Sequence, residues 1–159
     1  MQISIRQATI EDAPTLTRLL CELNYFQRLE KQSYEETLSQ VRRQLAGELS
    51  SDCHSIYVAE DENTSLTGYA AVHWLPYLFL PGPEGYVSEL FISVSARSQG
   101  VGTRLLETIR QDAQKRGCTR LSLVNMRQRE SYQRGFYKSR GWQERPEAAN
   151  FILKIGDND

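Results

Sequence analysis

The stretch ELFISVSARSQGVGTRLLETI, from Glu89 to Ile109, changes its pattern halfway along. Its first part is apolar and reads as a strand, and its last part places apolar residues at the spacing of one helix face. Gly100 and Gly102, together with the small polar residues before them, separate the two patterns. A strand that gives way to a helix within a few residues favours a domain in which helices pack on a β-sheet.

Strand-like and helix-like segments alternate along the rest of the chain. Ser33 followed by Glu36 is the capping-box signature of a helix start, and Gly117 is typical of the position just after a helix ends. The predicted order is β-α-α-β-β-β-α-β-α-β, a mixed central β-sheet flanked by helices in the α/β class. Strands are predicted at 2–8, 55–60, 66–74, 86–94, 120–124 and 150–155, and helices after Thr9, after Ser33, at 101–116 and at 130–140.

Size, charge and cysteine usage exclude several classes of protein. The 159 residues predict a single domain spanning 1–159, with 156–159 as a loose tail. A net charge of −1 gives no general attraction to nucleic acid or to an anionic membrane, so neither is expected as a partner. The three widely spaced cysteines predict no metal site and no disulfide framework. The first residues lack the pattern of a signal peptide, so a cytoplasmic location is expected.

The two glycines lie where a helix is predicted to begin. The first turn of a helix carries unpaired N–H groups and a partial positive charge, and glycine lets a bulky anion approach that backbone. The loop could therefore bind a phosphate or pyrophosphate; the alternative is a tight turn that simply needs glycine. A P-loop is excluded because no lysine follows at its spacing, and a dinucleotide fingerprint is excluded because Leu105 stands where its third glycine belongs.

The spacing R-x-x-G-x-G, from Arg97 to Gly102, resembles the acetyl-coenzyme A motif of the GCN5-related N-acetyltransferases, the GNAT family. The later stretch FYKSRGW, from Phe136 to Trp142, is similar to the closing F-Y-x-x-x-G-F signature of that family, with tryptophan where phenylalanine is more usual. The two motifs stand in the family's order, and the likeness covers nearly the whole chain. This resemblance implies the GNAT fold, acetyl-coenzyme A (acetyl-CoA) as co-substrate and N-acetyltransferase activity.

The resemblance also assigns residues to the cofactor. In the family, amides of the loop and helix start bind the pyrophosphate, and the central strand splays from the next one so that its backbone pairs with the pantetheine arm. Asn125 resembles the asparagine that reaches the pantetheine, although an unusually long gap separates it from Tyr137 and makes Tyr132 a competing hydroxyl. The residues predicted to bind the cofactor are Phe91, Ile92, Arg97, Ser98, Gln99, Gly100, Val101, Gly102, Thr103 and Asn125.

Two residues are predicted to carry the chemistry. Tyr137 occupies the position where many family members place the general acid that protonates the departing thiol; the alternative is an aromatic residue of the core. Glu89 lies within an apolar strand, where a carboxylate is costly unless it is paired or faces a cleft. It is the candidate base for the acceptor amine, and the alternative is a salt bridge to Arg6, Arg120 or another cation.

No cysteine has the surroundings of an activated nucleophile, so direct acetyl transfer in a ternary complex is expected. Two aromatic-rich segments, 24–34 and 73–86, are predicted to build the acceptor pocket. A subunit interface, which would make a homodimer, and packing on the protein's own core stay open for both segments. The leading hypothesis is acetylation of a primary amine of a small molecule. Acetylation of a protein or peptide amine and a non-catalytic acyl-CoA sensor are the alternatives.

Overall fold

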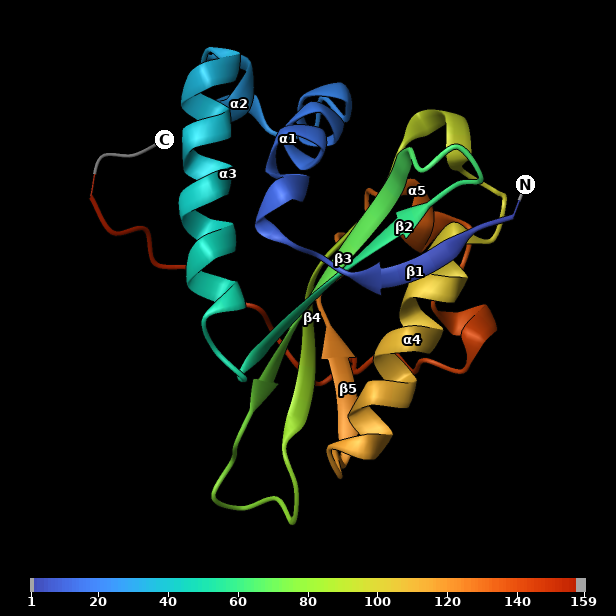
Figure 1. The fold of residues 1–159 in the computed structure, drawn as a ribbon. Helices are drawn as coiled ribbons and strands as arrows, with labels where there is room; N and C mark the ends of the chain where they lie inside the picture. The colour runs from blue at the N-terminus through green and yellow to red at the C-terminus, as the bar shows by residue number, and fades with distance from the viewer. Residues whose placement is uncertain (1, 157–159) are drawn as a thin grey trace. The chain divides into compact units, whose positions relative to one another are not determined.

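The computed structural model describes residues 2–156 and divides the chain into two compact units, Met1–Leu123 and Val124–Asp159 (Figure 1). The first unit is a mixed β-sheet with helices on both faces, and this confirms the predicted fold class. The prediction of a single domain over 1–159 stays a prediction. Residues 157–159 of the predicted tail lie outside the described residues.

The sheet of the first unit has five strands in the order β1-β2-β3-β4-β5. Neighbouring strands are antiparallel except for β4 and β5, which are parallel. The pairing of β4 with β5 ends at Val87 and Leu123, whereas β4 continues to Ile92 alongside β3. The strands are β1 Ser4–Gln7, β2 His54–Glu60, β3 Leu66–Leu75, β4 Glu84–Ile92 and β5 Arg120–Leu123.

Helices α1 and α3 lie on one side of this sheet and α4 lies on the other (Figure 1). The predicted capping box is formed at α3, because the Ser33 hydroxyl accepts from the Glu36 amide at 3.2 Å and the Glu36 carboxylate accepts from the Ser33 amide at 2.7 Å. The helices are α1 Ala13–Glu22, α2 Gln27–Glu30, α3 Tyr34–Leu49 and α4 Val101–Lys115, with 3₁₀ turns at Ile10–Asp12 and Val94–Ala96.

The core occupies both faces of the sheet. Between α1, α3 and the sheet, Leu16, Leu45 and Tyr69 belong to one buried cluster, with Phe91 packed against it. On the other face, α4 buries Leu105 completely. Period-two alternation therefore places Tyr69, Phe91 and Glu89 on the face that α1 and α3 cover.

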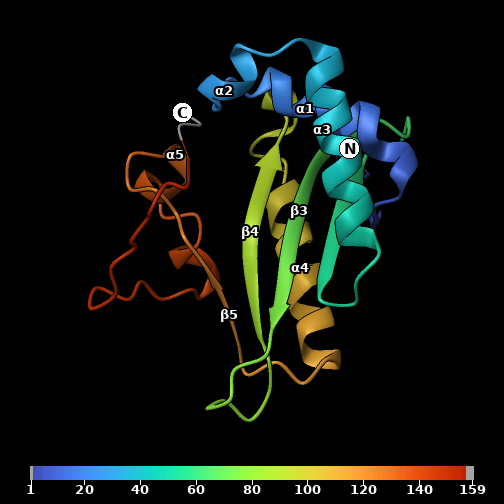
Figure 2. The same ribbon diagram turned by 90° about the vertical axis from the view of Figure 1, so that its left-hand side faces the viewer.

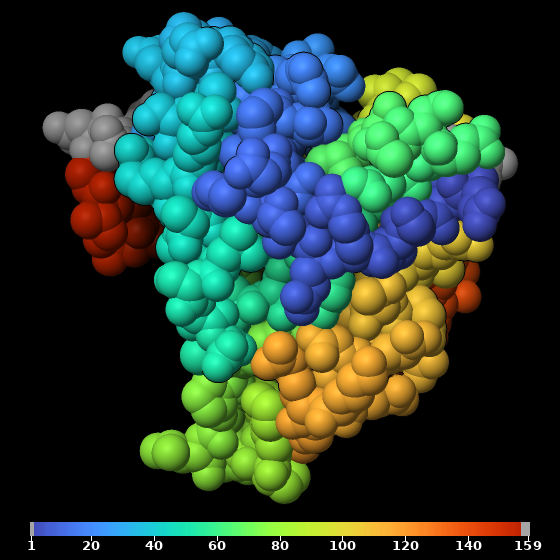
Figure 3. Space-filling view, in the orientation of Figure 1, coloured from blue at the N-terminus to red at the C-terminus, as the bar shows by residue number. Residues whose placement is uncertain are grey.

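The β3–β4 connection projects from the end of the sheet opposite to α1 and α2 (Figures 1 and 2). At its tip, the rings of Tyr77 and Phe79 pack on each other with centroids 5.3 Å apart, and Leu78 is fully exposed. The space-filling view shows this green segment standing out from the lower edge of the molecule (Figure 3). None of the helices within residues 2–156 has both the length and the apolar character needed to cross a membrane.

The second unit contains little regular structure within its described residues. A short helix, α5, spans Glu130–Gln133, and a 3₁₀ turn spans Lys138–Arg140. The strand predicted at 150–155 is wrong, because this segment is neither helix nor strand, and Phe151 and Ile152 are 91% and 81% exposed. A strand exists only where a neighbouring strand accepts and donates its hydrogen bonds, and the pattern of apolar residues does not supply that neighbour.

Candidate active site

The loop between β4 and α4 has the backbone shape that its glycine requires. Ser98 and Gly100 both have positive φ angles, +62° and +82°, and α4 begins at Val101 directly after them. The left-handed conformation of Gly100 explains its presence as a turn residue. A Cβ built on Gly100 would meet nothing within 4 Å, so the space beside the helix start is open as well. The backbone therefore agrees with the turn interpretation, and the phosphate site stays a prediction.

Side chains of the loop form hydrogen bonds that hold it in place. The Arg97 guanidinium donates to the Tyr25 hydroxyl at 2.7 Å and lies over the Tyr25 ring. Gln99 donates to the Ser95 carbonyl oxygen at 2.8 Å. The first bond within α4 runs from the Arg104 amide to the Gly100 carbonyl, at 3.1 Å. In general, the first amides of a helix have no acceptor within the helix itself, and such groups suit an anion.

The end of β4 offers an unpaired backbone edge within the first unit. The Ser93 amide donates to the carbonyl oxygen of Thr67, in β3, at 2.9 Å. Because backbone groups alternate in direction along a strand, those of Phe91 also point to β3, and those of Leu90 and Ile92 point to the side where β5 has ended. The sequence suggested Phe91 and Ile92 for the pantetheine arm; the geometry favours Ile92 and adds Leu90, which only the strand register could identify.

Glu89 faces the α1 and α3 side of the sheet and has no salt bridge among the described residues. The Tyr69 hydroxyl donates to Glu89 Oε2 at 2.5 Å. Both arginines named as alternative partners form salt bridges with other residues. Arg6 pairs with Asp12 and Glu60. Arg120 pairs with Glu84. The salt-bridge interpretation of Glu89 is therefore wrong for both named arginines.

The surroundings of Glu89 favour its protonated form. Burial is the main cause that raises the pKa of this carboxyl above its usual range, and the negative charge of Glu48 adds to the effect. The hydrogen bond from Tyr69 and the charge of His73 act in the opposite direction. A carboxylate with a raised pKa is a stronger base than an exposed one, which suits removal of a proton from an amine.

Aromatic residues line the same face next to Glu89. The Phe91 ring lies 5.3 Å from the Phe26 ring, 6.5 Å from the Tyr25 ring and 5.7 Å from the Tyr69 ring, between centroids. The segment 24–34 thus reaches the strand that carries Glu89, and its part in an acceptor pocket stays a prediction.

The second segment predicted for the acceptor pocket, 73–86, lies apart from the first. It forms the ends of β3 and β4 and the projecting connection between them, away from α2 at the other end of the sheet (Figure 2). An apolar sequence placed in a long hairpin loop does not reveal toward which end of the sheet the loop will extend. The two aromatic-rich segments therefore do not form one pocket within the first unit.

The second unit holds the remaining predicted site residues. Asn125 Oδ1 accepts a hydrogen bond from the Ser131 hydroxyl at 3.1 Å. The Tyr137 ring packs between those of Phe136 and Trp142, and burial raises the pKa of its hydroxyl. No hydrogen-bond partner of the Tyr137 hydroxyl lies within residues 2–156.

Tyr132, the competing hydroxyl, is already engaged. It donates to both oxygens of Glu144, at 3.0 and 3.1 Å, and Glu144 also pairs with Arg127 and Lys138. Of the two tyrosines in this unit, Tyr137 thus has the hydroxyl that is available to a ligand.

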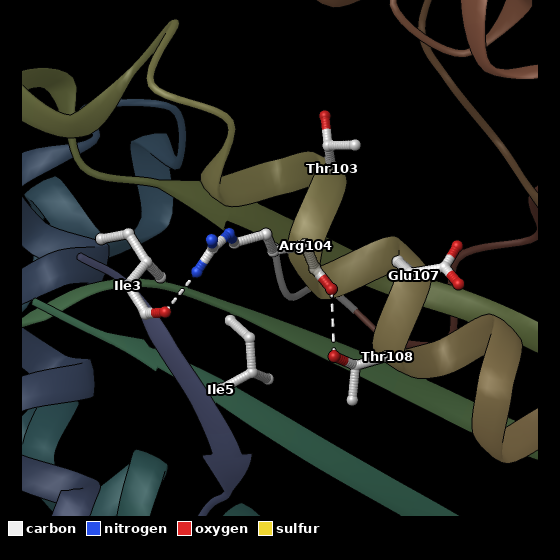
Figure 4. A pocket seen from close by; sticks show the side chains of 6 residues that line it. All are labelled: Ile3, Ile5, Thr103, Arg104, Glu107 and Thr108. Carbon is white, nitrogen blue, oxygen red and sulfur yellow. Dashed lines mark hydrogen bonds between the residues drawn. The ribbon is translucent and has the colours of Figure 1, made fainter. Parts of the chain in front are cut away.

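A separate pocket lies between β1 and α4 (Figure 4). It is open, has a volume of about 370 Å³ and is crossed by a hydrogen bond from Arg104 to the Ile3 carbonyl oxygen. Thr103 contributes to its wall, whereas Glu89 does not. Residues 2–156 contain no group of three or more His, Cys, Asp and Glu side chains that could hold a metal ion.

The sequence matches one family model, and the fold matches solved structures. The model described as "Acetyltransferase (GNAT) family" matches residues 16–142. Among curated proteins, none matches the sequence. The solved structures below share less than a quarter of their residues with the chain, so they show its fold alone.

Three of these structures cover almost the whole chain. A transcriptional regulator from Bacillus halodurans C-125 has a TM-score of 0.79 at 23% identity, with 98% of this chain and 99% of that chain covered. A ribosomal-protein-alanine N-acetyltransferase from Brucella melitensis biovar Abortus 2308 has a TM-score of 0.76 at 17% identity, covering 98% and 100%. A glucosamine-6-phosphate N-acetyltransferase from Arabidopsis thaliana has a TM-score of 0.74 at 20% identity, covering 99% and 100%. Their different descriptions leave the acceptor open.

Proposed function

The chain belongs to the acetyltransferase family known as GNAT, and on this premise we propose that it transfers the acetyl group of acetyl-CoA directly to a primary amine of a small molecule. Family membership supports acetyl transfer in general. The observation that carries the finer proposal is Glu89, a half-buried carboxylate without a salt bridge among the described residues, beside an aromatic wall. Burial makes such a group costly in its ionised form, and the single hydrogen bond from Tyr69 offsets only part of that cost.

The residues of the first unit fit the co-substrate. The open space beside Gly100 and the amides of the α4 start suit the pyrophosphate. The free backbone edge at Leu90 and Ile92 suits the amide-containing pantetheine arm, which can pair with it as an added strand does. The free edge of β4 and the start of α4 follow each other along the chain, so one extended ligand could bind to both. Acetyl-CoA supplies a thioester whose carbonyl carbon is open to attack by an amine.

The proposed roles of the two catalytic residues balance the protons of the reaction. Glu89, directly or through a water molecule, takes the proton that the amine must lose before its lone pair attacks the carbonyl carbon. As the carbon–nitrogen bond forms, the nitrogen gives up a second proton to water, and the carbon–sulfur bond breaks. Tyr137 gives its proton to the departing sulfur, and both residues then return to their starting states by exchange with solvent. No covalent enzyme intermediate is required.

The test is release of free thiol from acetyl-CoA in the presence of a panel of polyamines, amino acids, aminoglycosides and peptides. Turnover with at least one small amine supports the proposal. Turnover with peptides alone identifies a protein or peptide acetyltransferase instead. If acetyl-CoA raises the melting temperature but no amine releases thiol, the chain is a sensor of acyl-CoA and the proposal is overturned.

A further inference from the structure

Glu48, in the last turn of α3, has a buried carboxylate oxygen without a partner. Oε2 of Glu48 is closed off from solvent and accepts no hydrogen bond in the described part of the chain. Within residues 2–156, no lysine or arginine forms an ion pair with Glu48. A buried acceptor that is left unsatisfied in a folded protein requires an explanation, and a ligand with a hydrogen-bond donor is one.

Glu48 lies near Glu89 and Tyr69, although it comes from another element. Leu45, one turn before Glu48 on α3, belongs to the same buried cluster as Tyr69, whose hydroxyl donates to Glu89. The charge of Glu48 accordingly raises the pKa of the Glu89 carboxyl and of the Tyr69 hydroxyl. The charge of His73 acts in the opposite direction on Glu89; its ring shares a hydrogen bond of 2.8 Å with Ser88 and packs on His54. Neither Glu48 nor Glu89 has an ion pair with a lysine or arginine of residues 2–156.

The walls of this region suit an alkyl ammonium ion. Glu89, Phe91 and Glu48 are each partly exposed, so a ligand can reach them. The rings of Phe26 and Tyr69 lie 5.3 Å and 5.7 Å from that of Phe91, between centroids, and aromatic rings attract ammonium groups as carboxylates do. A carboxylate on the ligand would instead meet two negative charges and would be repelled.

From this arrangement we propose that the acceptor is a diamine or polyamine and that Glu48 binds its second ammonium group while Glu89 receives the amine that is acetylated. The inference rests on the proposed acetyltransferase function and names the substrate class of the same site. Glu48 is a binding residue here. It holds the charged end of the acceptor, so that the opposite amine lies beside Glu89, where its proton can be removed.

The test uses three amines of the same chain length that differ in the charge of the far end: cadaverine (ammonium), pentylamine (methyl) and δ-aminovalerate (carboxylate). For the natural protein, kcat/KM from thiol release should fall in this order, by about tenfold at each step, the ratio expected when one charge contact is gained or lost. In the presence of coenzyme A, cadaverine should also raise the melting temperature more than pentylamine at equal ionic strength.

Glu48→Gln isolates the contact with the far ammonium. It should raise KM for cadaverine about tenfold toward the value for pentylamine, with kcat nearly unchanged and with little effect on pentylamine. Glu35→Gln is the matched control, because it makes the same change in charge on an exposed position of α3, and it should alter none of these values. A purely structural role of Glu48 would change all three amines alike.

The two proposals fail in different ways. If acetyl-CoA neither raises the melting temperature nor releases thiol with any amine, the acetyltransferase function is wrong. If acetyl-CoA binds, but cadaverine is neither bound nor used better than pentylamine, the Glu48 inference is overturned while the function stands. An unchanged KM for cadaverine in Glu48→Gln also overturns it.

Discussion

At Glu89 the direction of the pKa shift fixes the expected pH dependence. A base must be ionised to accept a proton, and burial together with Glu48 keeps the Glu89 carboxyl protonated to a higher pH than usual. We therefore expect kcat/KM of the natural protein to fall as the pH drops through this raised pKa. Glu89→Gln lacks the base at every pH, so its kcat/KM should be lowered most where the amine is protonated and partly recover in more basic solution.

Glu89→Gln should also change the pH dependence of stability. Because the folded-state pKa of Glu89 is raised above the unfolded value, its favourable contribution is complete below the unfolded pKa and is lost as the pH rises through the folded pKa. Glutamine does not ionise, so the melting temperature of Glu89→Gln relative to the natural protein should rise as the pH increases from the ordinary carboxyl range through the raised pKa of Glu89. A melting temperature that falls at every pH, with normal turnover, would indicate a structural role only.

The two tyrosines of the second unit make a matched pair. Tyr137→Phe should lower kcat by about 10²-fold or more, which is the usual effect of losing a general acid, with little change in the binding of acetyl-CoA. Tyr132→Phe should keep most of its activity, because its hydroxyl already donates to Glu144. If Tyr132→Phe is the inactive variant instead, the acid has been assigned to the wrong residue.

At single residues, the sequence predicted which side chain is unusual but not which side chains surround it. Glu89 could be singled out because a carboxylate interrupts an apolar strand. Its neighbours could not, because Tyr69 comes from β3 and Glu48 from α3, and only the register of the sheet and the packing of the helix bring them together. The sequence already favoured Tyr137 over Tyr132 by its position, and the contact of Tyr132 with Glu144, which spacing does not reveal, supports this preference.

At the scale of elements, the start of α4 can be tested with two substitutions of equal shape. Asparagine and aspartate both tolerate the left-handed backbone of Gly100, and both are favourable before the first turn of a helix. Gly100→Asn should therefore keep much of the rise in melting temperature that acetyl-CoA causes, whereas Gly100→Asp should lose most of it by repelling the pyrophosphate. Equal ligand shifts in the two folded variants would refute an anion site at this loop.

The free edge of β4 can be followed by amide hydrogen exchange. The amides of Leu90 and Ile92 point away from β3, whereas that of Phe91 is held within the sheet. Acetyl-CoA should slow the exchange of Leu90 and Ile92 by at least about tenfold and change that of Phe91 much less, because only the first two gain a new acceptor. Equal protection of the three amides would show that the pantetheine arm does not pair with this edge.

The capped helix α3 was predicted correctly, the helix predicted at 130–140 ends already at Gln133, and the strand at 150–155, which depends on a distant partner, was wrong. The Ser33 capping box and the apolar stripe after it are complete within α3, so the sequence was sufficient. The segment 150–155 has the composition of a strand, yet strand pairing is decided by a second segment, and the described chain does not form it. The short helix α2 was missed because a single turn carries no periodic pattern.

For the whole molecule, the proposed reaction draws on residues from both compact units. The first unit, 1–123, carries Glu89, the free edge of β4 and the start of α4, and the second carries Tyr137 and Asn125. The family assignment was within reach of the sequence, because its two motifs are local spacings in a fixed order. The acceptor was not, since the side chains proposed to bind it come from three separate elements, α3, β3 and β4.

The central claim is that acetyl-CoA donates its acetyl group to an amine, and the most direct measurement follows both products in one reaction. With acetyl-CoA and an amine from the panel, free thiol and N-acetylated amine should accumulate in equal amounts, and neither should form without protein. In Tyr137→Phe both should fall together. Thiol that accumulates without acetylated amine, or acetyl-CoA that binds and releases no thiol with any amine, would contradict the account.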